Sequence, residues 1–334
     1  MKALTSILFF LFLFSGSFSV VANGRDSLMH RKRKDALALY KAMKESDSNA
    51  VRDSLGTELD EAMKGLLECK GAYGTKFPEL RKRIGILYAP DSSFRLFNWN
   101  VAYTNGTHDY FAYILRKRDN GKTELIDLDP MRNAAARNKK KGGGIRKRKL
   151  ERRDLKAKEW TPALYYRIIR KERKGKPFYT LLGWEGKDAL TTRKIIEVLR
   201  FDDKGRPQFG SPVFKKKKES KEEKESWREV DRERRKRVRR QGERSGPPPK
   251  QRIIFEFTDD AIMTLKYEKG KDRIVFNQLV PERPDLKGMY EFYGPDLLFN
   301  AYVWKSSGYW SFEKKVKPEN DSRSKTWNDP DPEE

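Results

Sequence analysis

The stretch FRLFNWNVAYTNGTHDYFAYILRKRDNGKTELID, from Phe94 to Asp127, decides the fold class of this chain. It is rich in aromatic and β-branched residues, which favour β-strands. Its pattern predicts strands at Phe94–Val101, His108–Arg116 and Thr123–Asp127, with Asp119–Lys122 as a turn. Connections this short join antiparallel neighbours, because a parallel crossover needs a dozen or more residues. The segment therefore predicts an antiparallel meander.

The same pattern continues almost to the end of the chain, in short aromatic and β-branched runs separated by turn residues. The runs predict further strands at Ala163–Glu172, Pro177–Trp184, Arg193–Phe201, Pro207–Phe214, Arg252–Thr258, Ala261–Glu268, Arg273–Val280, Met289–Tyr293, Leu298–Lys305 and Tyr309–Lys315. We therefore expect a mainly β protein whose antiparallel meander forms either a two-sheet sandwich or propeller-like blades.

Two internal echoes indicate a repeated unit. Pro90–Trp99 and Pro295–Trp304 share the pattern P-D-x-x-F-x(4)-W. Lys174–Tyr179 and Lys204–Phe209 share K-G-[KR]-P-x-[FY], in which the glycine permits a turn and the proline starts a strand. Repetition of this kind suits blades or a long sandwich.

The region before the meander, residues 23–75, is expected to be helical. Its apolar residues recur at helical spacing, and they are Ala36, Leu39, Tyr40, Met43, Leu55, Leu59, Ala62 and Leu66. Thr57 and Asp60 have the spacing of a capping box at the start of the second helix. We expect these helices to pack together or against the β body.

The first residues have the pattern of a secretory signal peptide. A short positive start at Lys2 precedes an apolar run at Leu4–Phe14, and Val20–Ala22 offers a cleavage site. The run is shorter than the roughly 20 residues that a membrane span needs. We therefore expect residues 1–22 to be removed, no transmembrane span afterwards, and a periplasmic, outer-membrane-associated or extracellular protein.

Two segments carry most of the formal net charge of +25. We interpret residues 132–159 as a basic flexible insert and residues 215–251 as a charged insert that is helical or disordered. The segments 76–131, 160–214 and 252–316 are then near-neutral parts of the β body, and 317–334 is a disordered acidic tail. Both inserts fall between predicted strands, where additional length costs little.

The inserts have three interpretations. They are solvated excursions, or they bind an anionic polymer or envelope surface in a salt-sensitive way, or they read a nucleic-acid sequence. The third is disfavoured, because no helix-turn-helix, zinc-finger or RNP motif accompanies the basic runs. The candidate contacts of an anionic polymer are Lys139, Lys140, Lys141, Arg234, Arg235, Lys236 and Arg237.

A family resemblance rests on four stretches: Phe94–Asn100, Phe178–Asp188, Phe209–Phe214 and Tyr293–Trp304. The chain resembles an uncharacterised family of exported proteins from Bacteroidetes-type bacteria, from about residue 77 to 315 and outside the basic inserts. The resemblance implies a bacterial envelope or extracellular setting. It implies no activity, cofactor or catalytic residue.

Several chemistries are excluded by composition. Cys69 is the only cysteine, so an internal disulfide is impossible, and only His30 and His108 could join it at a metal. Structural zinc, a di-iron site and a Cys–His dyad are therefore disfavoured. No Ser–His–Asp set, dinucleotide fingerprint, Walker loop or EF-hand loop is present. We expect no metal and no cofactor.

Five residues remain as weak candidates for chemistry or binding. Trp184 and Glu185 could form a sugar platform, or they could belong to a hairpin whose tryptophan covers the core. Asp91, Asp188 and Asp296 could serve glycoside hydrolysis if two of them lay about 5–9.5 Å apart. The echoed Asp91 and Asp296 could instead hydrogen-bond the backbone of the turn before a strand.

The sequence does not identify a ligand or a substrate. The leading hypothesis is a non-catalytic binding or scaffolding protein of the bacterial cell envelope. One alternative is a hydrolase of glycan or another polymer that uses loop carboxylates. Another alternative is a salt-sensitive binder of anionic polymers through the basic inserts.

Overall fold

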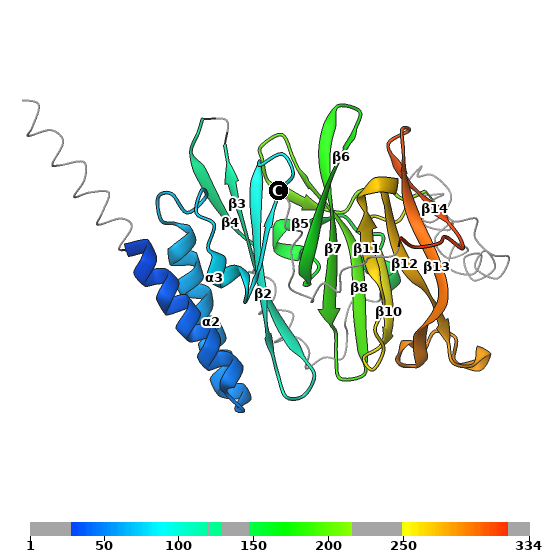
Figure 1. Cartoon of the computed structure of the whole chain (residues 1–334), viewed down its shortest axis with the longest axis horizontal. Coiled ribbons are helices and arrows are strands. Elements are labelled where there is room, and N and C mark those ends of the chain that lie inside the picture. Colours follow the sequence, from blue (N-terminus) through cyan, green and yellow to red (C-terminus); the bar gives the residue numbers. More distant parts are fainter. Residues whose placement is uncertain (1–27, 119, 129–146, 216–248, 320–334) are drawn as a thin grey trace, which may run out of the picture.

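The computed structural model describes residues 28–118, 120–128, 147–215 and 249–319 of the 334-residue chain. Figure 1 shows the helices at one end of the molecule and three sheets following them along its longest axis. All three sheets are built from antiparallel pairs. The expectation of a mainly β, antiparallel protein with a helical N-terminal region is confirmed. The number of stacked sheets, however, is three and not the two of a sandwich.

The helical layer contains a helix at residues 28–45, helix α2 (Asn49–Leu67) and the short helix α3 (Pro78–Arg81). Ser48 caps α2 by accepting a hydrogen bond from a backbone N–H of its first turn. The expected capping box at Thr57 is wrong, because Thr57 lies inside α2 and its hydroxyl donates to the Asp53 carbonyl. Leu59 and Leu66 are buried, as their helical spacing predicts.

The first sheet follows the order β1-β2-β3-β4. Its strands are β1 (Gly85–Tyr88), β2 (Phe94–Ala102), β3 (His108–Lys117) and β4 (Thr123–Asp127). The last three agree with the strands predicted from the opening stretch. β1 was not predicted, and it pairs with β2 at the edge of the sheet.

The second sheet is the central layer. Its strands are β5 (Leu155–Lys156), β6 (Leu164–Arg173), β7 (Lys176–Gly186), β8 (Thr191–Phe201), β9 (Pro207–Phe209) and β10 (Ile253–Thr258). β7 and β8 form its middle. β10 pairs with the first half of β8 and β9 with the second half. Residues 210–252, which include most of the charged insert, thus separate in sequence two strands that pair with the same edge of β8.

The third sheet follows the order β11-β12-β13-β14. Its strands are β11 (Leu265–Glu268), β12 (Arg273–Pro281), β13 (Tyr293–Lys305) and β14 (Tyr309–Glu313). After β14 the chain turns back over this sheet: the N–H of Val316 donates to the Phe299 carbonyl, and Arg273 donates to the Lys317 carbonyl. The final described residues therefore belong to the fold.

The alternation of side chains divides the interior into three cores. Phe97 and Trp99 face the helices, whereas Phe94 and Leu96 face the second sheet. In the same way, Leu181 of β7 faces the first sheet and Leu182 faces the third. The first and second sheets are consequently buried on both faces, which explains their almost continuous apolar runs.

The first sequence echo falls on strands in different places of their sheets. Pro90–Trp99 runs from a turn into β2, the second strand of the first sheet, whereas Pro295–Trp304 lies within β13, the third strand of the third sheet. The sheets lie one behind the other in Figure 1, and the echo does not mark equivalent positions in them.

Some predicted boundaries are wrong. Met289–Tyr293 was predicted as a strand, but its centre is the 3₁₀ turn η5 (Tyr290–Phe292). The predicted strand Pro207–Phe214 ends at Phe209 in β9. Gly210 follows with φ of 102°, a conformation that suits glycine and redirects the chain.

The first basic insert is shorter than expected. Residues 147–159 form α5 (Lys147–Leu150), β5 and the 3₁₀ turn η2 (Ala157–Glu159). Leu155 is buried, and the buried Arg252 donates to the carbonyls of Leu150 and Arg153. The expectation that this segment is flexible is therefore wrong, because these contacts hold it to the second sheet.

The expected signal peptide, the remaining basic segment 132–146, most of the charged insert and the end of the acidic tail lie outside the described residues. Within the described residues, none of the helices combines the length and the apolar character that a membrane crossing requires.

Candidate functional site

The candidate Asp91 lies in the turn between β1 and β2. Its Oδ1 accepts hydrogen bonds from the backbone N–H and the hydroxyl of Ser93, and its Oδ2 accepts from Tyr179 at 2.7 Å and from Arg170 Nε at 3.0 Å. Burial opposes ionisation, but the hydrogen bonds from Ser93, Tyr179 and Arg170 outweigh it and lower the pKa of Asp91 below its usual value. Asp91 therefore holds a turn and links the first two sheets.

Asp188 and Asp296 also accept hydrogen bonds from backbone N–H groups close to them in the chain. Asp188 Oδ1 accepts from the backbone N–H groups of Leu190 and Thr191 at 3.1 and 2.8 Å. Asp296 accepts from the N–H of Leu298 and from the side chain of Gln278. The side chains of Asp91 and Asp296 each accept the backbone N–H two residues ahead. Asp91 does so in the turn before β2, as the interpretation of the echo expects, whereas Asp296 lies at a bulge inside β13 and not in a turn before a strand.

The structure does not bring the three aspartates together. Asp91 contacts Tyr179 near the start of β7, whereas Asp188 follows the end of β7 at Gly186. Seven residues of strand separate these points by about 23 Å, at a rise of about 3.3 Å per residue. Asp296 lies in a different layer, the third sheet. Asp91 and Asp188 therefore cannot form the close carboxylate pair of a glycosidase.

Trp184 and Glu185 are adjacent in β7 but contact different neighbours. The Trp184 ring packs edge-on against His108, with ring centroids 5.3 Å apart. The Glu185 carboxylate contacts Arg193 of β8 at 3.3 Å. His108 begins β3, as expected, and its Nδ1 lies 2.8 Å from the Asn100 amide. Trp184 thus helps to join the first and second sheets.

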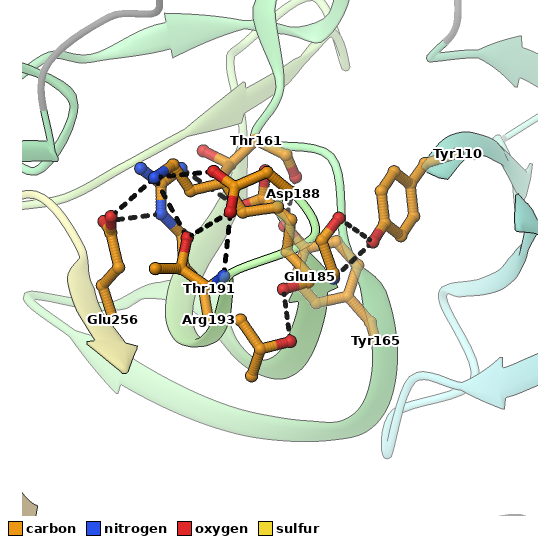
Figure 2. A network of polar contacts seen from close by, with 11 residues as sticks. Tyr110, Thr161, Tyr165, Glu185, Asp188, Thr191, Arg193 and Glu256 are labelled. Atoms are coloured by element: carbon orange, nitrogen blue, oxygen red, sulfur yellow. Dashed lines mark hydrogen bonds and ion pairs between the residues drawn. The ribbon is translucent and has the colours of Figure 1, made fainter. Parts of the chain in front are cut away.

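Glu185 belongs to a cluster of charged side chains, which we call the glutamate–arginine cluster: Glu185, Lys187, Arg193 and Glu256. Arg193 stands directly between the two glutamates, because the strand register places it opposite Glu256 of β10 and opposite Glu185 of β7. Opposite charges at facing positions stabilise neighbouring strands. Figure 2 shows Arg193 and Glu256 joined to each other beside Thr191 and Asp188.

The ion pairs of the glutamate–arginine cluster are short and buried. Arg193 Nε lies 2.9 Å from Glu256 Oε2, and Lys187 Nζ lies 2.9 Å from Glu256 Oε1. Arg193 and Glu256 are 8% and 4% exposed, so little water competes for these contacts. Each charge of the cluster has at least one partner of opposite sign.

The two glutamates titrate differently. Burial raises the pKa of Glu185, although Arg193 opposes this shift. For Glu256, burial acts in the same direction, but the charges and hydrogen bonds of Arg193 and Lys187 outweigh it and lower the pKa. Two carboxyls whose pKa values move apart around one arginine have the electrostatic arrangement of a general acid and a general base. Burial of both side chains restricts substrate access, which favours a structural role.

The hairpin that carries Glu185 is fixed to the first sheet. Tyr110 of β3 accepts a hydrogen bond from the Gly186 N–H at 2.7 Å and donates to the Gly186 carbonyl at 3.3 Å (Figure 2). Burial raises the pKa of Tyr110 well above its usual value, so the phenol stays protonated. Through Tyr110 the glutamate–arginine cluster is connected to the interface between the first and second sheets.

A second buried pair lies further along β8. Arg252 Nε is 2.6 Å from Glu197 Oε2, and both side chains are fully buried. Burial raises the pKa of Glu197, which the charge of Arg252 opposes. Arg252 also donates to backbone carbonyls of Phe209, Leu150 and Arg153. This arginine therefore holds the segment around β5 against the second sheet.

Three large apolar side chains are exposed on segments that hydrogen bonds connect. Leu190, Ile262 and Leu297, which we call the apolar tips, are 66%, 92% and 95% exposed. The carbonyl of Leu190 accepts the N–H of Asp259 in the turn that carries Ile262. Asn277 accepts the N–H of Thr264 and donates to the carbonyl of Asp296, which connects the turn of Ile262 to the bulge of Leu297.

In the described part of the chain, no three or more His, Cys, Asp or Glu side chains lie close enough together to hold a metal ion. Cys69 is a half-buried thiol whose Sγ lies 3.5 Å from the Gly65 carbonyl. The seven candidate polymer contacts at positions 139–141 and 234–237 lie outside the described residues.

Sequence reasoning missed Arg193 and Glu256. The signal was present, because each is a charged residue inside a predicted strand: TTRKIIEVL for Arg193, which also holds Lys194 and Glu197, and the otherwise apolar IIFEF for Glu256. Charged side chains at such positions are paired in folded proteins. Their pairing could not be assigned, because the charged insert separates β8 from β10.

Comparisons with known proteins give no family or relative. No family model, no curated protein and no solved structure matches the chain.

Proposed function

We propose that this chain is an exported, non-catalytic binding or scaffolding protein of the bacterial cell envelope, and that it attaches to an anionic envelope surface. The observation that carries the proposal is the exposure of the apolar tips on segments that hydrogen bonds connect. Large apolar side chains exposed together mark sites of contact with a partner or a membrane surface.

The chemistry of the body supports binding over catalysis. Asp91, Asp188 and Asp296 accept hydrogen bonds from backbone N–H groups close to them in the chain. Glu185 and Glu256 are already paired with Arg193, and Glu256 is also paired with Lys187. Side chains committed to the fold in this way are poorly available to a substrate.

The charge of the chain supports an anionic surface as the partner. The formal net charge is +25, and basic segments near a lipid surface gain about 1 kcal/mol per Lys or Arg. Apolar side chains that enter the interface add to this attraction. The signal-like leader and the resemblance to exported envelope proteins agree with this setting.

The test is cosedimentation with vesicles of phosphatidylglycerol and phosphatidylethanolamine. Replacing the three apolar tips by serine should lower the apparent affinity at least about tenfold, because three apolar side chains no longer leave water. The matched control replaces Leu28 and Val51, which are 38% and 45% exposed on the helical layer. Equal binding of the two variants would refute a role for the tips.

The contribution of the basic segments is measured separately. A variant that lacks residues 133–145 and 218–246 keeps every described helix and strand. It should leave a heparin column, or anionic vesicles, at clearly lower salt than the full chain. Unchanged elution would exclude the basic segments as contacts of anionic polymers.

A hydrolase remains the second candidate, because the pKa values of Glu185 and Glu256 move in opposite directions around Arg193. In that case these glutamates, and not the aspartates of separate turns, would act on a glycan or another polymer. Release of soluble fragments from dye-labelled peptidoglycan or polysaccharide by the wild type, and not by Glu256→Gln, would support it. Equal release by both proteins would exclude it.

A further inference from the structure

Four arginines are buried in the described part of the chain, and one of them differs from the others. Three place a carboxylate against Nε: Arg193 contacts Glu256 at 2.9 Å, Arg252 contacts Glu197 at 2.6 Å, and Arg273 contacts Glu268 at 2.6 Å. The fourth, Arg95 of β2, is 1% exposed and has no hydrogen-bond partner at Nε or Nη2.

The donors of Arg95 are divided between two ends of its guanidinium. Nη1 donates to the carbonyls of Ala72, Tyr73 and Thr75 at 2.8–2.9 Å, which ties the chain after α2 to the first sheet. Nε and Nη2 remain. Their N–H bonds run parallel along one edge of a guanidinium, and this edge binds the two oxygens of a carboxylate or phosphate group side by side.

The surroundings of Arg95 supply aromatic faces in place of an acid. Its Cζ lies 4.6 Å from the centre of the Tyr88 ring, 4.8 Å from Phe97 and 5.5 Å from Phe77. Burial lowers the pKa of Arg95, which shows that its environment disfavours the charge. A buried cation without a counter-charge is costly, and an anion at the free edge would remove that cost.

A second arginine with a free donor lies at the same tyrosine. Arg81 of α3 has its Cζ 5.9 Å from the Tyr88 ring, and its buried Nε also lacks a hydrogen-bond partner. Tyr88 is 41% exposed and belongs to the edge strand β1. Its ring therefore borders both guanidinium groups and the solvent.

We propose that the Nε–Nη2 edge of Arg95 binds an oxyanion, a carboxylate or phosphate group, which enters beside Tyr88 with Arg81 as a second donor. The ligand takes the place that Glu256, Glu197 and Glu268 occupy at the other three arginines. The site lies between the helical layer and the first sheet, and it is separate from the apolar tips and from the glutamate–arginine cluster.

The first experiment measures thermal unfolding of the full chain in sodium phosphate, sodium acetate and sodium chloride at equal ionic strength. At an oxyanion concentration about ten times its Kd, Tm should exceed the chloride value by about 3 °C. Phosphate and acetate as separate arms distinguish the two oxyanions. Equal Tm values in all three salts would overturn the proposal.

Two variants distinguish oxyanion binding at Arg95 from the general attraction of anions to a cationic protein. Arg95→Lys keeps the charge but loses the Nε–Nη2 edge, so the rise in Tm that phosphate or acetate causes relative to chloride should disappear. We call this rise the oxyanion increment. Arg252→Lys is the matched control, since Arg252 is equally buried but already paired with Glu197, and it should keep the increment. An increment that persists in Arg95→Lys contradicts the proposal.

A measurement on the wild type covers the case in which Arg95→Lys does not fold. The Arg95 Nε–H resonance, assigned through bonds in arginine-labelled protein, should shift on addition of inorganic phosphate or acetate. An Nε–H signal that stays in place while exposed arginines shift would show that the anions bind elsewhere, and the proposal would be wrong.

Discussion

Replacing Arg252 by methionine should destabilise the protein more than any change on its surface. Arg252 is fully buried, and its Nε donates to Glu197 at 2.6 Å. Its other donors reach the carbonyls of Phe209 at 3.1 Å, of Arg153 at 2.7 Å and of Leu150. Methionine fills much of the same volume but leaves Glu197 as a buried charge without its partner.

The magnitude follows from these contacts. Removing one member of a buried ion pair costs about 3–5 kcal/mol, because the remaining charge is uncompensated. The carbonyls of the segment around β5 lose their donor as well, and each buried unsatisfied acceptor costs about 1–3 kcal/mol if water cannot reach it. We therefore expect a loss of at least about 4 kcal/mol for Arg252→Met, with residues 147–159 released from the second sheet.

The assay is urea unfolding followed by tryptophan fluorescence, to which Trp160 contributes close to the altered contacts. Lys305→Met is the control. Its ion pair with Glu313 at 2.8 Å joins two side chains that are each 44% exposed, so its loss should stay below about 1 kcal/mol. The double variant Arg252→Met with Glu197→Leu should recover part of the loss, since no buried charge remains. A loss below about 1 kcal/mol for Arg252→Met would falsify the assignment of 147–159 to the folded body.

Three further outcomes are expected from individual side chains. The hydrogen bonds of Ser93, Tyr179 and Arg170 outweigh burial and lower the pKa of Asp91. The lowered pKa gives stability that is present above the ordinary aspartate pKa of 3.8 and is lost as the pH falls through the pKa of the folded state. Asp91→Asn should therefore flatten acid unfolding below pH 3.8, and an unchanged acid limb in circular dichroism would contradict this. Burial lowers the pKa of Lys194 to about 8 from 10.5, so its charge destabilises the fold below that pH and wild-type stability should rise between about pH 8 and 10.5. Burial lowers the pKa of Lys147 to about 8 as well, so Lys194→Met should reduce this rise in urea midpoints without abolishing it, and an undiminished rise would contradict the assignment. Trp310 is fully buried, so Trp310→Ala should cost about 3–5 kcal/mol in the same assay, and a loss below about 1 kcal/mol would show that the third sheet is not packed on the second as described.

Local patterns predicted the strands well where aromatic and β-branched residues run on for five residues or more. β2, β3 and β4 match their predictions within a residue at either end, because aromatic and β-branched residues fill both faces of each strand. β1 and β5 were missed, since four and two residues give no period to detect. The helix start at Ser48 was missed because Thr57 offered a second, equally plausible cap.

The stacking of the layers could not be predicted from periodicity. A strand buried on both faces predicts only that something covers each face, and the sequence does not state whether a helix or another sheet does so. Arg95 illustrates the same limit. Its place in FRLFNW marks a charge within an apolar strand, but only the packed structure reveals that the carbonyls after α2 take one end of its guanidinium and leave the other free.

The two basic segments return to the described body at neighbouring points. The described chain resumes at Lys147 after the first segment and at Pro249 after the second. These two points are close, because Glu151 pairs with Lys250 at 2.9 Å and its carbonyl accepts the Gln251 N–H at 2.7 Å. The points of departure differ, because the Leu128 N–H donates to the Ala112 carbonyl of the first sheet and the Lys215 N–H donates to the Trp310 carbonyl of the third. Two inserts that are far apart in the sequence thus share only their point of return beside the central sheet, and deleting each one separately would divide their contributions to salt-dependent binding.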